Sequence, residues 1–142
     1  MTTIKIAQTD EEILSCYPVM SELRPHITQD DFLPQVKRQM NDSGYELVFL
    51  TDDDDIKAVA GIRIAEWLAR GKSLDLEDLV STENDRSKGY GGQIFDWLVN
   101  YARESHCNEI RLVSHVSRHG AHRFYLNKRM LLDCHFFSMS LK

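Results

Sequence analysis

The chain has 142 residues, of which 42% are hydrophobic and 27% are charged, and its formal net charge at pH 7 is −5. This length and composition suit one globular domain over residues 1–142, with a core that needs neither metal nor disulfide. The negative charge disfavours a non-specific nucleic-acid binder, and the lack of a long apolar run or a signal peptide predicts a cytoplasmic protein without a membrane span.

The first half of the chain predicts one strand, two helices and a hairpin. Alternation predicts a strand over residues 2–8, and apolar residues at helical spacing predict helices from Asp10 to Pro25 and from Thr28 to Met40. Two strands, 45–50 and 58–65, flank the polar run 51–57, which we expect to be a hairpin loop. The acidic tetrad in this loop lacks the glycine and the distal glutamate of a calcium loop, so we favour a solvated turn.

The second half predicts a strand, a helical crossover and a further strand. Strands are expected over 73–80, 109–116 and 136–141, and helices over 91–105 and 121–128. In the last strand, Phe137, Met139 and Leu141 share one face. The order of elements indicates a mixed α/β fold, with hairpins first and a strand, helix, strand crossover later.

A glycine-rich turn, RSKGYGG, joins the strand ending at Val80 to the amphipathic helix 91–105. The first N–H groups of a helix lack partners and carry a partial positive charge, so glycines there let the backbone approach a phosphate. Arg86 and Lys88 would add cationic donors. The same glycines could instead serve only a tight turn. The turn matches neither GxxxxGK[ST] nor GxGxxG.

This turn resembles the signature of the GNAT superfamily of N-acetyltransferases, Arg/Gln-x-x-Gly-x-Gly/Ala after a strand, here Arg86 to Gly91. The stretch AHRFY, residues 121–125, resembles the family's last helix, and EDLVSTENDR before the turn agrees as well. The AHRFY stretch and His135-Phe136 resemble bacterial small-amine acetyltransferases, including aminoalkylphosphonate N-acetyltransferase. The resemblance implies an α/β (α+β) acyl-CoA N-acyltransferase fold, with a mixed, mostly antiparallel sheet and about four flanking helices.

The resemblance also implies how the cofactor is held. In the family an amine attacks the acetyl-CoA thioester directly, and the strand before the turn holds the pantetheine arm. Here that strand supplies Leu79, Val80 and Ser81. The pyrophosphate would lie on the turn, which consists of Arg86, Ser87, Lys88, Gly89, Tyr90, Gly91 and Gly92. Arg118 aligns with an asparagine that often contacts the cofactor arm, so its own part in cofactor binding is an open expectation.

Tyr125 matches the family's tyrosine, which protonates the departing CoA thiolate. A phenol of pKa ≈ 10 can donate a proton at neutral pH. The alternative is that Tyr125 only packs beside Phe124. The usual Gly-Phe after this helix aligns with Arg129-Met130, and without a glycine to adopt a left-handed helix end we expect altered geometry after Lys128.

A proton acceptor for the amine is expected on the strand before the turn. Strand alternation places Asp78 in phase with Leu76 and Val80, hence partly buried, and it places Asp75 and Glu77 on the other face unless a bulge shifts the phase. We rank Asp78 first and Glu77 second. The other interpretation is a solvated acidic edge. Three histidines, His115, His119 and His122, span a strand-to-helix junction without a completing ligand, and the three cysteines include no CxxC pair. We therefore expect no metal site, no disulfide and no thiol nucleophile.

Together these features predict an acetyl-CoA-dependent N-acetyltransferase that acts on a primary amine of a small molecule or peptide. Two alternatives stay open: a catalytically silent acyl-CoA-binding or regulatory domain, and a nucleotide-binding module. The helices between Asp10 and Met40 are expected to shape the acceptor site, as they do in the family. A homodimer is a further expectation from the family.

Overall fold

The computed structural model describes all residues from 1 to 142, in two compact units, Met1–Arg111 and Leu112–Lys142. In chain order the elements are β1 (Thr2–Ile6), α1 (Asp10–Ser15), α2 (Tyr17–Leu23), α3 (Gln29–Ser43), β2 (Tyr45–Asp52), β3 (Asp55–Trp67), β4 (Gly71–Ser81), the 3-10 helix η1 (Glu83–Lys88), α4 (Tyr90–Glu104), β5 (Glu109–Leu112) and α5 (His119–Asn127).

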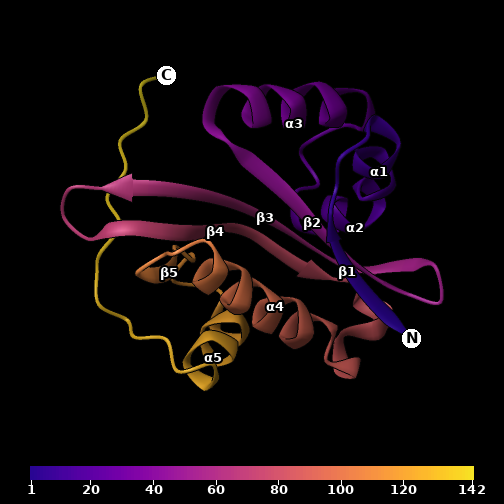
Figure 1. Cartoon of the computed structure of the whole chain (residues 1–142). Helices are drawn as coiled ribbons and strands as arrows, with labels where there is room; N and C mark the ends of the chain where they lie inside the picture. Colours follow the sequence, from indigo (N-terminus) through magenta and orange to yellow (C-terminus); the bar gives the residue numbers. More distant parts are fainter. The chain divides into compact units, whose positions relative to one another are not determined.

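The first unit is built on a sheet with the strand order β1-β2-β3-β4-β5 (Figure 1). β1 to β4 pair antiparallel with their neighbours. β5 follows its neighbour β4 through α4, the helical crossover that joins parallel strands. The expected mixed, mostly antiparallel sheet is therefore confirmed.

Helices cover both faces of this sheet. In Figure 1, α1, α2 and α3 lie over one face and α4 over the other. The first face forms the main core cluster, in which Val19, Phe32 and Val36 pack on Leu47 and Val59. The face under α4 buries a second apolar set, Ile94, Phe95 and Leu98. None of the helices combines the length and the apolar character needed to cross a membrane.

The first predicted helix is divided into two. Thr9 caps α1 by accepting a hydrogen bond from the Glu12 N–H, and the Glu12 carboxylate in turn accepts from the Thr9 N–H, a capping box. The chain then turns at Cys16, and α2 begins with Pro18 in its first turn. Proline has no N–H to donate, so a new helix start at this point is favoured over a continuous helix.

The β2–β3 hairpin is tighter than predicted. Asp52 is opposed to Asp55, so only Asp53 and Asp54 form the loop, with φ values of 51° and 71°. A two-residue turn of this kind needs left-handed backbone at both positions, and aspartate tolerates that conformation better than most residues. The polar run predicted as a longer loop thus mostly extends the two strands.

The second unit consists of the end of β5, α5 and the segments that flank α5. Two predicted strands differ here, because β5 ends at Leu112 instead of residue 116 and residues 136–141 form no strand. Phe137, Met139 and Leu141 are exposed. An alternating pattern specifies a strand only where a partner backbone and a buried face exist, and the structure provides neither for these residues.

The end of α5 corrects another expectation. Arg129 has a φ of 68°, the Met130 N–H donates to the Tyr125 carbonyl, and the Arg129 N–H donates to the Leu126 carbonyl. These two bonds define the Schellman ending that usually contains glycine. The left-handed end is kept, with arginine in the glycine position.

Candidate active site

A β-bulge in β4 determines which carboxylates share a face. Gly61 is opposed to Asp78 and Ile62 to Leu76, so Glu77 is an extra residue without a partner on β3. Gly61 and Ile62 are consecutive and point to opposite faces, and directly opposed residues share a face. Asp78 therefore lies on the face opposite to Leu76. The prediction that Asp78 is in phase with Leu76 was wrong, because a bulge interrupts the register, whereas its predicted phase with Val80 and its partial burial are confirmed.

The bulge brings Glu77 and Asp78 to one cavity on the face covered by α1, α2 and α3. This first cavity has a volume of about 310 Å³. Its lining combines apolar and polar side chains from the helices with the two carboxylates of β4, and consists of Met20, Arg24, His26, Ile27, Phe32, Gln35, Val36, Gln39, Tyr45, Glu77 and Asp78. Its size is that of a small-molecule site, with a few polar groups that converge on one wall.

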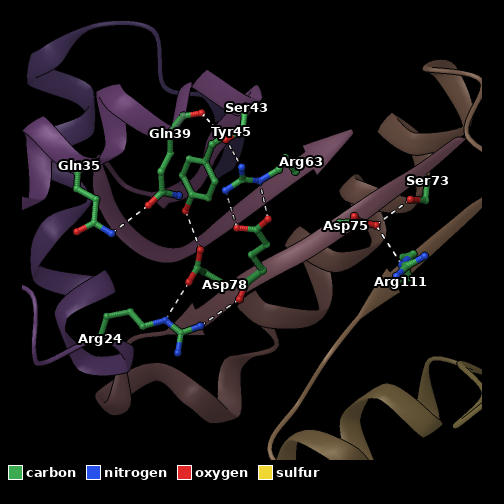
Figure 2. Close-up of polar contacts among 11 residues, drawn as sticks. Arg24, Gln35, Gln39, Ser43, Tyr45, Arg63, Ser73, Asp75, Asp78 and Arg111 are labelled. Carbon is green, nitrogen blue, oxygen red and sulfur yellow. Dashed lines mark hydrogen bonds and ion pairs between the residues drawn. The ribbon is translucent and has the colours of Figure 1, made fainter. Parts of the chain in front are cut away.

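Both oxygens of the Asp78 carboxylate are held, as Figure 2 shows. The Arg24 Nε donates to Asp78 Oδ1 at 2.9 Å, and the Tyr45 hydroxyl donates to Oδ2 at 2.8 Å. Arg24 also donates to the Glu77 carbonyl at 3.1 Å. Burial, and then the Asp78 charge, raise the pKa of the Tyr45 phenol well above its usual value, so Tyr45 acts as a permanent hydrogen-bond donor.

Glu77 has its own arginine. Arg63 binds the Glu77 carboxylate through Nε at 2.6 Å and through a second nitrogen at 3.1 Å, a bidentate contact that fixes both side chains. Arg63 also donates to Ser43 and lies 5.7 Å from the centroid of the Tyr45 ring. Figure 2 shows this group of contacts beside Gln35 and Gln39 of α3, which are joined at 3.1 Å.

Asp75, the third carboxylate of β4, belongs to a different group. It accepts from the Ser73 hydroxyl at 2.8 Å and pairs with Arg111 at 3.4 Å (Figure 2). It does not line the cavity that contains Glu77 and Asp78. Of the carboxylates on β4, two therefore face a common cavity.

The glycine-rich turn consists of η1 and the start of α4. Gly89 has a left-handed φ of 80° and precedes the first helical residue, Tyr90. Asp85 organises η1, because its carboxylate binds Thr82, Lys57 and Lys88. These contacts, with Lys88 the strongest, hold the pKa of the Asp85 carboxyl at about 2. The turn thus has a preorganised backbone.

The turn leaves room and donors for an anion. A Cβ built on Gly89 or on Gly91 meets no atom within 4 Å. The first bond inside α4 runs from the Gln93 N–H to the Gly89 carbonyl, so the N–H groups before it lack intrahelical acceptors, and no side chain caps them. Phosphate oxygens fit such an open helix start. The residues present are therefore compatible with a CoA pyrophosphate.

The charged side chains of the turn are exposed, and each of them pairs with a carboxylate. The side chains of Arg86 and Lys88 are 56% and 60% exposed, and they pair with Glu22 at 3.7 Å and Asp85 at 3.0 Å. Tyr90 differs, since it is buried and its hydroxyl donates to Asp52 at 2.6 Å. The Tyr90 side chain thus anchors α4 to the end of β2.

The residues expected to hold the pantetheine arm follow the cavity along β4. Leu79, Val80 and Ser81 are opposed to Ala60, Val59 and Ala58 of β3. In an antiparallel ladder, every second residue directs its N–H and C=O away from the partner strand. Strand β4 therefore contains the carboxylates that line the cavity, Glu77 and Asp78, followed directly by the backbone that is expected to bind the cofactor.

Tyr125 and Arg118 lie in the second unit, on α5 and directly before it. Burial raises the pKa of the Tyr125 phenol, and the nearby Arg118 charge lowers it by less. The Phe124 and Tyr125 rings meet edge to face at 5.4 Å. The Nε2 atom of His122 is 2.9 Å from the His115 carbonyl oxygen, so this histidine binds backbone.

Cys16 and Cys107 are free thiols with different surroundings. Cys16 is buried, and burial raises the pKa of its thiol to about 12. Burial also raises the pKa of the Cys107 thiol. Neither is suited to act as a thiolate nucleophile at neutral pH.

Several site residues were not predicted from the sequence, namely Arg24, Tyr45, Arg63 and Gly61. Arg24 and Tyr45 lie 54 and 33 positions from Asp78 in the chain, and no local spacing relates them. Gly61 did offer a signal, because a glycine inside a strand often marks a bulge or a close approach.

Comparison with known proteins identifies the family. The acetyltransferase (GNAT) family profile matches residues 6–130. The chain belongs to the GNAT family. Members are N-acetyltransferases that take the acyl group from an acyl-CoA and transfer it to small-molecule or peptide acceptors, which confirms the expected superfamily and enzyme class.

Individual relatives of this GNAT chain agree in length and fold. It is 33% identical over 128 residues to the uncharacterized N-acetyltransferase YhdJ of Bacillus subtilis (strain 168), and covers 90% of both chains. A transcriptional regulator from Bacillus halodurans C-125 has a similar fold, with a TM-score of 0.86, 19% identity and coverage of 99% and 100% of the two chains. A GNAT family acetyltransferase of Staphylococcus aureus subsp. aureus USA300_TCH1516 superposes with a TM-score of 0.81, 16% identity and coverage of 99% and 98%.

Proposed function

We propose that this GNAT enzyme transfers an acetyl group from acetyl-CoA to a primary amine of a small molecule, by direct attack in a ternary complex. The observation that carries the proposal is the cavity with Glu77 and Asp78 on its β4 wall, immediately before the backbone of Leu79 to Ser81. An amine in this cavity lies beside the strand on which the family binds the pantetheine arm.

The glycine-rich turn is the proposed pyrophosphate site. The backbone N–H groups of Tyr90, Gly91 and Gly92 and the side chains of Arg86, Ser87 and Lys88 would hold the phosphates, with Gly89 shaping the turn. Leu79, Val80 and Ser81 would hold the arm through backbone groups, and Arg118 would contact it. When bound, acetyl-CoA supplies the acetyl group as an activated thioester.

Asp78 and Glu77 are proposed to bind the ammonium form of the acceptor and to take up its proton, with Asp78 first. Their arginine partners and Tyr45 orient the two carboxylates, because both oxygens of Asp78 and both of Glu77 accept hydrogen bonds. Tyr125 is proposed as the acid that protonates the leaving thiolate, since its phenol remains protonated at neutral pH.

Release of free CoA tests the proposal. Purified protein is incubated with acetyl-CoA and a panel of small amines, polyamines, aminophosphonates and N-terminal peptides, and the thiol is measured. Tyr125→Phe should lower kcat by about 10²–10⁴-fold with acetyl-CoA binding retained. Tyr101→Phe is the matched control, because it removes a phenol of α4 that binds Glu46 of β2.

Two results would redirect the proposal. Tight acetyl-CoA binding without amine-dependent CoA release across the panel would favour a silent acyl-CoA-binding or regulatory domain. Thermal stabilisation by ATP but not by acetyl-CoA would favour a nucleotide-binding module. The expected homodimer stays a prediction, which sedimentation can test.

A further inference from the structure

Two hollows of opposite charge adjoin each other along α3. In the first cavity, one arginine, Arg24, stands against the two carboxylates Glu77 and Asp78, and His26 is the remaining titratable side chain besides Tyr45. The second cavity, of about 340 Å³, reverses this balance, with Arg38 and Arg63 against one carboxylate, Asp42.

The two cavities share a wall. Gln35 and Gln39 line both of them, and the ion pair of Arg63 with Glu77 links a residue of the second cavity to a residue of the first. Each glutamine amide can donate and accept hydrogen bonds, so this wall suits the middle of a polar ligand. The hollows thus form one groove with an acidic end on β4 and a basic end on α3.

Arg38 is the cation of this groove without a protein partner. Arg24 and Arg63 pair with Asp78 and Glu77, whereas the structure contains no hydrogen bond or ion pair to the Arg38 side chain. The Arg38 side chain is exposed on α3. Its guanidinium is therefore available to an anionic group of a ligand.

We infer that the acceptor is a small amine that also carries an acidic group, such as a carboxylate. This inference rests on the proposed acetyltransferase function. The ammonium group binds at Asp78 and Glu77, next to the transfer site, and the acid binds Arg38 at the other end. A ligand of zero net charge leaves the ion pairs of Arg24 with Asp78 and of Arg63 with Glu77 intact. A diamine would instead bring its second positive charge toward Arg38 and Arg63.

The test compares acceptors that differ only at the far end. β-Alanine, propanolamine and trimethylenediamine each present a primary amine on a three-carbon chain, with an acid, a neutral group and a cation at the other end. γ-Aminobutyrate, aminobutanol and putrescine repeat the comparison with four carbons. We expect kcat/KM, measured by CoA release, to be about tenfold or more higher for the acid than for its two partners.

A pair of charge-matched variants assigns the effect to Arg38. Arg38→Gln should lower kcat/KM about tenfold for the acids and leave the alcohols unchanged. Lys37→Gln removes the same charge from the neighbouring position of α3, where the lysine pairs with Asp10 and does not line the groove. It should leave all six acceptors unchanged, which excludes a general effect of net charge.

The outcomes separate this inference from the function on which it rests. A preference for alcohols or diamines, no turnover of the acids, or an equal loss for all acceptors in Arg38→Gln overturns the inference. CoA release with any amine keeps the acetyltransferase proposal in each of these cases. Failure of acetyl-CoA to stabilise the wild-type protein would overturn the acetyltransferase proposal itself.

Discussion

The carboxylate of Asp78 lies over the backbone of Gly61, in the space where a side chain on residue 61 would begin. The two residues are opposed across the β3–β4 ladder, and a Cβ on Gly61 would clash with Asp78 Oδ2 and with the Tyr45 hydroxyl. The absence of a side chain at residue 61 is therefore a condition for the hydrogen bond between Tyr45 and Asp78.

Gly61→Ala should damage both the fold and the site. The added methyl group must displace the Tyr45 ring or the Asp78 carboxylate, and overpacking of this kind lowers the free energy of unfolding by about 1–3 kcal/mol. Urea unfolding measures the loss, and the acetyltransferase assay measures the accompanying fall in kcat.

Two further variants check the cause of the Gly61→Ala effect. Gly120→Ala adds a methyl group that meets no atom within 4 Å, so its stability should not fall. In the double variant Gly61→Ala, Tyr45→Ala, both the Tyr45 hydroxyl and the ring carbon beside the added methyl group are gone, so its loss of stability should be smaller than the sum of the two single losses. Additive losses would contradict the steric explanation.

Gly91→Ala should separate cofactor affinity from stability. Alanine is favoured over glycine in a helix by about 0.5–1 kcal/mol, and the methyl group meets no protein atom, so the melting temperature should stay constant or rise. On the proposed pyrophosphate site the same methyl group obstructs the ligand, and CoA affinity should fall about tenfold. Calorimetric titration measures the CoA affinity, and thermal unfolding measures the melting temperature. An unchanged CoA affinity would contradict the proposed pyrophosphate site at this turn.

The contribution of the Asp85 carboxylate to the free energy of unfolding should be lost at acid pH. Its pKa lies at about 2 in the fold, below the ordinary 3.8, because Lys88, Thr82 and Lys57 bind the ionised form. The stability this provides is fully present above about pH 4 and is lost as the pH falls through about 2. Asp85→Asn should therefore be less stable than wild type at neutral pH, and the difference should shrink toward pH 2.

The matched control for Asp85 is Asp54→Asn. Asp54 is exposed in the β2–β3 turn, has no ion-pair partner, and asparagine tolerates its left-handed backbone as well. The free energy of unfolding of this variant, measured with urea, should differ from that of wild type by a small amount that stays constant from about pH 5 to about pH 2. The same narrowing in both variants would argue against a specific role for Asp85.

Arg129→Gly should stabilise the end of α5. Arginine at a φ of 68° bears a strain of about 1–2 kcal/mol that glycine does not, while the two hydrogen bonds of the ending use backbone only. Thermal unfolding should show a higher midpoint. Arg123→Gly, in the middle of the same helix, should have the opposite effect because glycine weakens a helix interior.

Local patterns predicted the elements that depend on neighbouring residues. Thr28 caps α3, the glycine-rich turn precedes α4, and the apolar stripe of α4 is buried, all as their spacing indicates. Each of these features involves residues within a few positions of each other. Helix caps and helix faces depend on interactions over a few positions, so they can be predicted from the sequence alone.

The site itself depends on contacts between distant parts of the chain. Whether Asp78 shares a face with Leu76 or with Glu77 is decided by the pairing of β4 with β3, and alternation alone cannot show an interrupted register. The arginine partners come from α2 and β3. Likewise, the alternating residues 136–141 were predicted as a strand because a pattern does not reveal whether a partner backbone exists.

The extra residue in β4 has an evolutionary consequence. Because Glu77 has no opposite residue on β3, whether Asp78 shares a face with Leu76 depends on how many residues lie between them rather than on which residues they are. Point substitutions along β4 can change the chemistry of the cavity wall but leave its geometry in place. Loss of the Glu77 codon would instead leave Leu76 and Asp78 opposite their present partners on β3 and remove one carboxylate from the cavity in one step.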